Sequence, residues 1–257
     1  MLLRWLKNWK RRTFLSQPFP PAWLEILDRN VLGYAALNED QQARVRDYLL
    51  VFLPEKNWEG CGGQAMNHEV QVTIAAQVAI LTLGLEDEYF ENVLSILVYP
   101  TAYVAPGKEI TRGGVVLEEG PARLGEAWYR GPVIFSWQDV LSGGRQTQAG
   151  NVVYHEFAHQ LDMLNGQRVD GAPPIEDAAQ AERWAKVCAE HYQQLVQACE
   201  LDQPTLIDCY GATNEAEFFA VTTETFFTQP RRLATLHPAL YEILRDYYRQ
   251  DPAARTK

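Results

Sequence analysis

The stretch that most restricts the fold spans residues 152–166 and has the sequence VVYHEFAHQLDMLNG. Within it, His155 and His159 are four residues apart, so on an α-helix they lie one turn apart on the same face. Two imidazoles in this arrangement can bind a single Zn²⁺ at about 2.0–2.1 Å. Glu156 follows the first histidine and would lie beside the ion, where its carboxylate can accept a proton from a bound water. The pattern therefore predicts a helix that carries a metal centre.

The residues around this HExxH motif favour a helix. The run from Asn151 to Leu164 contains no proline and no glycine, and Asn165-Gly166 is typical of the left-handed stop that ends a helix. The apolar positions give the segment a side that can be buried; they are Val152, Val153, Phe157, Leu161 and Leu164. We predict a helix over residues 149–164.

A catalytic zinc ion has three protein ligands and an open fourth position for water. A metzincin would continue as HExxHxxGxxH, and Asp162 and Asn165 stand at the positions of that glycine and histidine, which excludes this class. Three ligands on one straight helix would span about 10 Å, too far for one ion. Asp162 is therefore interpreted either as a hydrogen-bonding support for a ligand histidine or a nearby backbone group, or as a surface acid late in the helix.

The other candidate ligands lie in residues 214–227, NEAEFFAVTTETFF, which form an amphipathic helix pattern. Glu217 and Glu224 share one face of this helix, among phenylalanines. An acid in such a setting is rarely buried unless it is paired or bound to a metal. Periodicity alone leaves the third ligand open between Glu217 and Glu224, and a solvated helix acid is the alternative for either.

The remaining periodicity predicts an α+β fold, with a small mixed β-sheet packed against several helices. The main helices are expected at residues 38–54, 67–83, 149–164, 177–200, 214–228 and 238–250. Strands are expected at Val93–Val104, near Val115–Leu117 and at Val133–Trp137. Residues 138–150 are expected to form a loop or the approach to the motif helix. The apolar segment from Val70 to Leu85 is too short and too polar to span a membrane and is predicted to be a buried core helix.

Charge divides the chain into a basic start and an acidic remainder. The whole chain has 23 Lys+Arg and 33 Asp+Glu, a net charge of −10, which argues against general nucleic-acid binding. Residues 1–12 hold five cations and no acid in an amphipathic pattern, typical either of an arm that binds a membrane surface or a partner, or of a frayed terminus. We predict a basic arm over residues 1–20 and one domain over residues 21–257.

The four cysteines have no CxxC spacing, so a thiolate metal site and a disulfide scaffold are not expected. Free thiols in a reducing compartment are the prediction, and with no signal peptide or membrane-spanning segment we expect a cytoplasmic protein.

Two stretches of the sequence together resemble a known protein family. The stretch VVYHEFAHQLDMLNG and the later IDCYGATNEAEFFAVTTETFF (207–227) resemble the Mlc titration factor A family of bacterial zinc-dependent peptidases. LSILVYPTAYV (94–104) and GPVIFSW (131–137) are similar to the family in the same order, and the resemblance covers roughly residues 20–250. It implies a zincin-like metallopeptidase fold with an active-site HExxH helix.

The resemblance also implies roles for single residues. It places the third zinc ligand on Glu217, an active-site tyrosine on Tyr210 and a supporting acid on Glu224. A tyrosine hydroxyl near the metal could stabilise the oxyanion that forms when water attacks a carbonyl; a tyrosine packed in a loop is the alternative. GPVIFSW is interpreted either as an edge strand that pairs with an extended peptide or as an ordinary core strand.

The implied activity is hydrolysis of peptide or protein substrates with Glu156 as general base, with aminopeptidase action as one form of it. The family further implies binding of the Mlc repressor, which would relieve repression of sugar (glucose) uptake genes. The alternative function is a non-catalytic protein that sequesters a transcriptional repressor and in which zinc is structural.

Overall fold

The computed structural model describes residues 2–85, 88–101, 131–146, 150–166 and 169–255. The first part contains α1 (Leu2–Leu15), α2 (Pro21–Asn30), α3 (Leu32–Ala35), α4 (Glu39–Glu55), β1 (Asn57–Gly60) and α5 (His68–Thr82). The centre contains β2 (Ser95–Tyr99), β3 (Val133–Ser136), α7 (Trp137–Arg145), α8 (Val152–Asp162) and the 3₁₀ turn η1 (Met163–Asn165). The last part contains α9 (Ala178–Glu200), η2 (Cys209–Ala212), α10 (Glu215–Thr228), α11 (Pro230–Leu236), α12 (Pro238–Tyr248) and η3 (Pro252–Ala254).

The sheet has the order β1-β2-β3, and both described strand pairs are parallel. The predicted α+β class and zincin-like fold are confirmed, but the sheet was expected to be mixed and its described strands are not. The predicted strand near Val115–Leu117 lies outside the described residues. β1 was not predicted, because Asn57-Trp58-Glu59-Gly60 lacks the apolar alternation of a strand. It is held instead by its ladder with β2, in which Trp58 pairs with Ile96.

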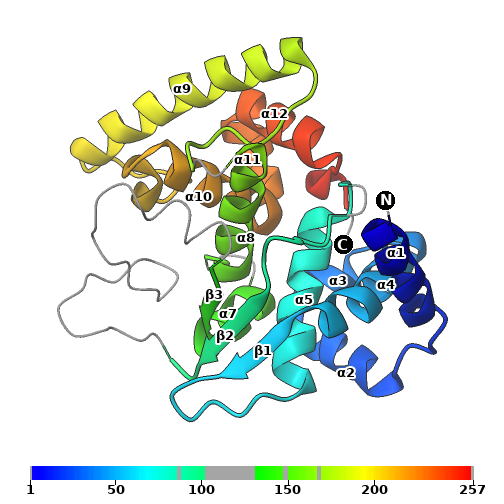
Figure 1. Cartoon of the computed structure of the whole chain (residues 1–257). Coiled ribbons are helices and arrows are strands. Elements are labelled where there is room, and N and C mark those ends of the chain that lie inside the picture. Colours follow the sequence, from blue (N-terminus) through cyan, green and yellow to red (C-terminus); the bar gives the residue numbers. More distant parts are fainter. Residues whose placement is uncertain (1, 86–87, 102–130, 147–149, 167–168, 256–257) are drawn as a thin grey trace.

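The motif helix α8 lies between the sheet and the group formed by α9 to α12 (Figure 1). Its apolar side is fixed by Phe157, which is fully buried. The Phe157 ring lies 4.7 Å from that of Phe90, 6.2 Å from that of Phe52 and 6.3 Å from that of Phe135, measured between centroids. Because these rings come from α4, the loop before β2, and β3, one side chain ties α8 to three parts of the fold.

The central helix α5 is buried along almost its whole length, as predicted for this apolar segment. Helix α4 begins with the predicted capping box, in which the side chains and backbones of Asn38 and Gln41 bond reciprocally. No helix in the described ranges has both the length and the apolar character needed to cross a bilayer. Residues 138–150 were expected to form a loop or an approach to α8, and most of them form α7.

The first helix, α1, packs against α4. Arg11 forms a bidentate ion pair with Glu55, at 2.8 and 2.9 Å, and contacts Glu91 at 3.3 Å, while Lys7 pairs with Glu91 at 2.7 Å. The guanidinium of Arg11 also lies 4.3 Å from the ring centroid of Tyr89. Helix α1 is therefore held to the rest of the described chain through Lys7 and Arg11.

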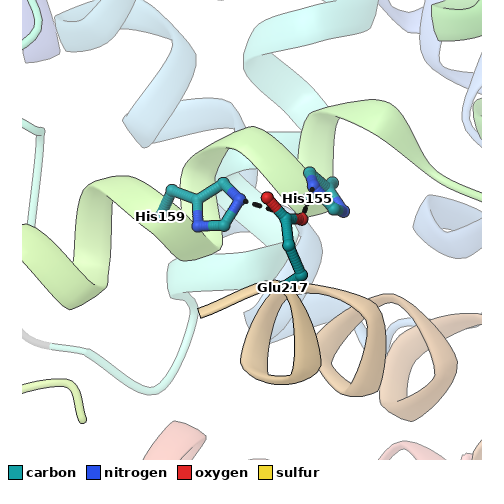
Figure 2. A group of neighbouring side chains, drawn as sticks. All are labelled: His155, His159 and Glu217. Carbon is teal, nitrogen blue, oxygen red and sulfur yellow. Dashed lines mark ion pairs between the residues drawn. The ribbon is translucent and has the colours of Figure 1, made fainter. Parts of the chain in front are cut away.

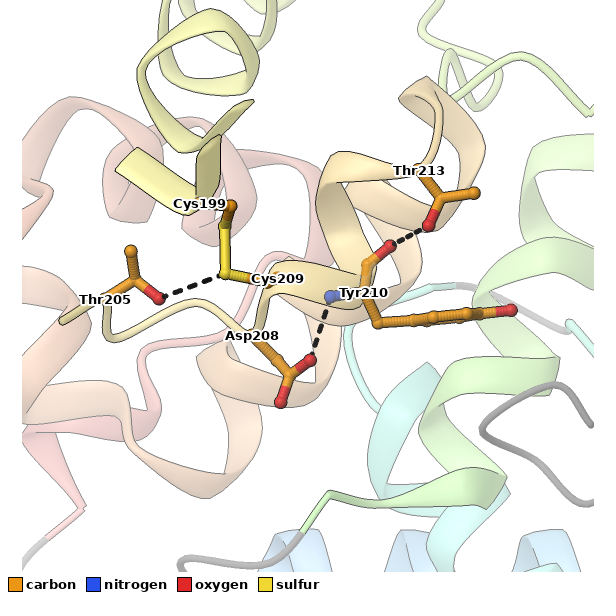
Figure 3. Close-up of a disulfide and its surroundings, with 6 residues drawn as sticks. All are labelled: Cys199, Thr205, Asp208, Cys209, Tyr210 and Thr213. Atoms are coloured by element: carbon orange, nitrogen blue, oxygen red, sulfur yellow. Dashed lines mark hydrogen bonds between the residues drawn. A yellow bond between two sulfur atoms is a disulfide. The ribbon is translucent and has the colours of Figure 1, made fainter. Parts of the chain in front are cut away.

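The prediction of four free thiols was wrong. Cys199, at the end of α9, forms a disulfide with Cys209 in η2, and among the four cysteines Cys61 and Cys188 are free (Figure 3). Spacing rules could not reveal this pair, because the chain turns back after α9 and brings the two Cα atoms to 5.8 Å over a separation of ten residues.

Candidate metal centre

The two helices that carry the site each begin with an asparagine cap and pack against each other. The Asn151 side chain accepts a hydrogen bond from the Tyr154 amide at the start of α8, at 3.0 Å. At the start of α10, the Asn214 side chain accepts one from the Glu217 amide, at 2.9 Å. These caps fix where each helix begins, and so fix where Glu217 meets α8.

His155, His159 and Glu217 point toward one another across the two helices (Figure 2). The Oε2 atom of Glu217 lies 3.0 Å from His155 Nε2 and 3.5 Å from His159 Nε2. One ligand atom from each residue fits within 4.8 Å of the others, a spacing at which the group can hold a metal ion. The chain thus brings together the two histidines of the motif and one acid from sixty residues further on.

The pKa values of His155 and Glu217 each depend on the charge of the other residue. Burial alone would lower the pKa of His155, but contact with the carboxylates of Glu217 and Glu224 raises it to about 10. Burial would raise the pKa of Glu217, but the two histidines lower it to about 2. Both partners therefore favour a carboxylate facing a positive charge, and a cation bound between them would take the place of the proton.

Two buried atoms in the site have no hydrogen bond. Glu217 Oε2 approaches both histidines without hydrogen-bond geometry, and His159 Nδ1 also has no partner among the described residues. A buried carboxylate oxygen without a partner is costly. A bound cation would satisfy it, and two imidazoles with one carboxylate form a donor set that suits a divalent transition metal. The residues present therefore fit a metal site.

Glu224 lies on the other side of His155. Its Oε1 atom accepts a hydrogen bond from His155 Nδ1 at 2.8 Å, and its Oε2 atom accepts one from the Asn151 amide at 2.6 Å. The geometry thus groups Glu217, and not Glu224, with the two histidines. Glu224 orients the imidazole and leaves Nε2 facing Glu217.

Glu156 is partly buried beside His155, as its position in the motif predicts. Burial raises the pKa of its carboxyl above the ordinary value, while the nearby His155 and His159 act in the opposite direction. A carboxylate with a raised pKa is a stronger base near neutral pH.

Tyr210 belongs to η2, and its ring centroid lies 5.9 Å from that of His155. The backbone around it is held from both sides: Asp208 Oδ1 accepts from the Tyr210 amide, and Thr213 Oγ1 donates to the Tyr210 carbonyl (Figure 3). The tyrosine predicted at the site is therefore next to the first histidine.

Asp162 is fully buried, which rules out the interpretation as a surface acid. Its Oδ2 atom accepts a hydrogen bond from the Gly171 amide at 2.7 Å. Burial raises the pKa of its carboxyl to about 6, although the Gly171 amide opposes the shift. Asp162 thus supports the backbone that follows α8, the second of the roles considered for a supporting residue.

Asn151 is the residue of this region that the sequence did not suggest. Besides capping α8, it donates through its backbone to Glu224 and through its side chain to Gln77 Oε1, at 2.7 Å. Its position just before the motif was a signal for a cap, but nothing in the sequence indicated the contact with Glu224.

Comparison with known proteins agrees with this geometry. Residues 6–249 match the model of the family described as glucose-regulated metallo-peptidase M90. An uncharacterised protein of Synechocystis sp. is 39% identical over 250 residues, which are 96% of this chain and 90% of the relative. Mlc titration factor A of Yersinia enterocolitica is 30% identical over 255 residues, 98% of this chain and 92% of the relative. Mlc titration factor A of Yersinia pestis is also 30% identical, over 98% and 91%. The chain therefore belongs to the M90 metallopeptidase family.

Proposed function

We propose that this protein is a zinc-dependent peptidase whose ion is held by His155, His159 and Glu217. The observation that carries the proposal is the convergence of two imidazoles and one carboxylate, with the buried oxygen of Glu217 lacking a hydrogen bond. When bound, Zn²⁺ would polarise the scissile carbonyl and lower the pKa of a water molecule at the site. Membership of a metallopeptidase family supports a metal ion at the site and peptide bonds as the target, and a donor set of two imidazoles and one carboxylate suits zinc.

The side chains around the group have the chemistry that hydrolysis requires. Glu156 would accept the proton of the attacking water and return it to the leaving amine, a role favoured by its raised pKa. Tyr210, held beside His155 by η2, would donate a hydrogen bond to the oxyanion that develops on the carbonyl. Glu224 would keep His155 in one orientation throughout.

We further propose that the substrate binds as an extended peptide along β3. Within the described residues, β3 is an edge of the sheet, since it pairs only with β2, and it contacts α8. An edge strand can pair with an added peptide strand through backbone hydrogen bonds. Aminopeptidase action is one version of this proposal. A peptide with a free amino terminus would then be cleaved faster than the same peptide with a blocked one.

A second function is favoured by the names of two relatives. The Yersinia proteins are called Mlc titration factor A, so we propose an Mlc-type repressor as a protein partner. If the protein acted only by sequestering a repressor, zinc would be structural and Glu156 would be dispensable.

The metal assignment is tested by the metal content of the purified protein. We expect about one Zn²⁺ per chain in the wild type and loss of most of it in His155→Ala, because the imidazole is one of three ligands. His68→Ala is the matched control, since His68 is exposed and also precedes a glutamate. Equal zinc in wild type and His155→Ala would refute the site.

Glu156→Gln separates the two functions. We expect it to keep zinc and partner binding but to lose peptide hydrolysis by about 10²–10⁴-fold, the usual contribution of a general base. Glu190→Gln, an exposed acid on α9, is the control and should be as active as the wild type. Undiminished hydrolysis would show that the base is another residue. Undiminished regulation in cells would favour the repressor-binding function.

A further inference from the structure

A cavity lies at the start of α8, and no residue of the metal group lines it. It has a volume of about 480 Å³ and is enclosed by α3, the end of α7, the start of α8, the turn between α10 and α11, and the segment around η3. Its walls combine apolar side chains, such as Phe227 and Leu32, with three arginines, Arg231, Arg232 and Arg255. Both the volume and the mixture of apolar and polar walls are typical of small-molecule sites.

The three arginines donate hydrogen bonds to neutral groups of the described residues. None forms an ion pair with a carboxylate in the described part of the chain. Their hydrogen bonds go to neutral acceptors: Arg231 to the Ala253 carbonyl, Arg232 to the Gln229 amide oxygen and Arg255 to the Gln250 amide oxygen. In a chain with a net charge of −10, three guanidinium groups around one cavity make a local site for an anion, even though the charge of Asp251 acts on Arg255.

A polar group on the wall is also left without a partner. Tyr154, on α8, is only 6% exposed and lines the cavity. No hydrogen bond joins its hydroxyl to a described residue, and this oxygen is not among the fully buried polar atoms that lack a partner, so it is accessible and can donate to an occupant of the cavity. This hydroxyl and the arginines therefore provide donors from two different elements at the same cavity.

We propose that this cavity binds a small phosphomonoester. Guanidinium groups match the geometry of phosphate oxygens and bind them through pairs of hydrogen bonds. The Tyr154 hydroxyl can donate to the same group or to a hydroxyl of the ligand. The apolar wall at Phe227 and Leu32 would take the organic part of the molecule. The cavity shares no lining residue with the metal group, and Asn151 connects the two, because it lines the cavity and its amide donates to Glu224.

The test is calorimetric titration of the full-length, metal-loaded protein with inorganic phosphate and with phenyl phosphate at constant ionic strength. We expect both to bind, and phenyl phosphate more tightly because its ring can occupy the apolar wall. Arg255→Gln should weaken phenyl phosphate binding about tenfold or more, as loss of a charged hydrogen bond does. Arg44→Gln, which removes an exposed arginine from α4, is the matched control and should bind like the wild type.

Three outcomes would overturn the proposal. The first is no binding of either compound. The second is equal affinity in the wild type and Arg255→Gln, which would place the anion elsewhere, for instance at the metal. The third is equal loss in Arg44→Gln, which would indicate a general charge effect. If Arg255→Gln does not fold, Tyr154→Phe replaces it, since this change removes a single hydroxyl; unchanged affinity there, together with unchanged affinity in Arg232→Gln, would also refute the site.

Discussion

At the scale of single residues, the orientation of His155 depends on Glu224, an acid outside the group of three candidate ligands. Glu224 is buried, and its two oxygens are each committed to one donor, His155 Nδ1 and the Asn151 amide. A carboxylate that accepts from the second nitrogen of a ligand histidine fixes the ring and increases its basicity. The affinity for the metal should therefore depend on Glu224 almost as strongly as on a ligand.

Glu224→Gln is expected to lower zinc affinity by about 10–100-fold. The amide has one oxygen, so it can accept from only one of the two donors and leaves the other unsatisfied. Competition with a chromophoric chelator measures the effect. Glu215→Gln, an exposed acid at the start of the same helix, should not change the affinity. Equal affinities for the two variants would mean that Glu224 only fills space.

The sequence could identify the two histidines because their spacing alone places them on one face. It could not choose between Glu217 and Glu224, which lie seven residues apart on the same stripe. That choice depends on the position of α10 along α8. Packing between the two helices and the cap at Asn214 determine this position. The family resemblance, rather than periodicity, pointed to Glu217.

At the scale of elements, the placement of Tyr210 depends on the short turn η2. This turn is joined to the end of α9 by the Cys199–Cys209 disulfide, and Tyr210 is the next residue after Cys209. The disulfide therefore restrains the backbone that carries the proposed oxyanion donor (Figure 3).

Cys209→Ser should lower the free energy of unfolding by about 2–3 kcal/mol, the loss of loop closure over a ten-residue separation. It should also reduce kcat more than it raises KM, because Tyr210 acts on the transition state. A phosphine reductant, which cleaves the disulfide without adding a thiol that could bind zinc, should do the same to the wild type. Cys61→Ser, which removes a free thiol, is the control. If kcat is the same with and without the disulfide, then Tyr210 is positioned by its other contacts.

Two of the missed elements, β1 and α11, share one physical cause. Neither β1 nor α11 has a periodic apolar pattern of its own, and each is stabilised by neighbours distant in sequence: β1 by its ladder with β2, and α11 by packing on α12 and η3. The long helices α5, α9 and α10 were predicted because their apolar stripes and caps are local. Pairing of Cys199 with Cys209 likewise depends on a reversal of the chain that no spacing rule contains.

At the scale of the whole molecule, the basic first helix is joined to the acidic body by charge. Arg11 connects α1 to α4 through Glu55, and both side chains of this pair are largely buried, at 13% and 14% exposure. Glu91, before β2, contacts Lys7 and Arg11 together. Two of the five cations at residues 1–12 are thus neutralised within the chain.

Arg11→Gln should destabilise the protein by about 1–3 kcal/mol, because it leaves the largely buried Glu55 without its charged partner. Urea denaturation measures the change. Arg12→Gln is the matched control, since the neighbouring side chain is exposed and makes no ion pair with a described residue. Equal stability of the two variants would show that the Arg11–Glu55 ion pair does not stabilise the fold.

Asn151 links the arginine-lined cavity to the metal group. It lies in the wall of the arginine-lined cavity, and its amide donates to the carboxylate that orients His155. If an occupant of the cavity displaces this asparagine, it alters the affinity of the protein for its ion. Thermodynamic reciprocity then requires that the ion alter the affinity for the occupant by the same factor. Hydrolytic capacity would then follow the supply of a small metabolite without any contact between that metabolite and the peptide being cut.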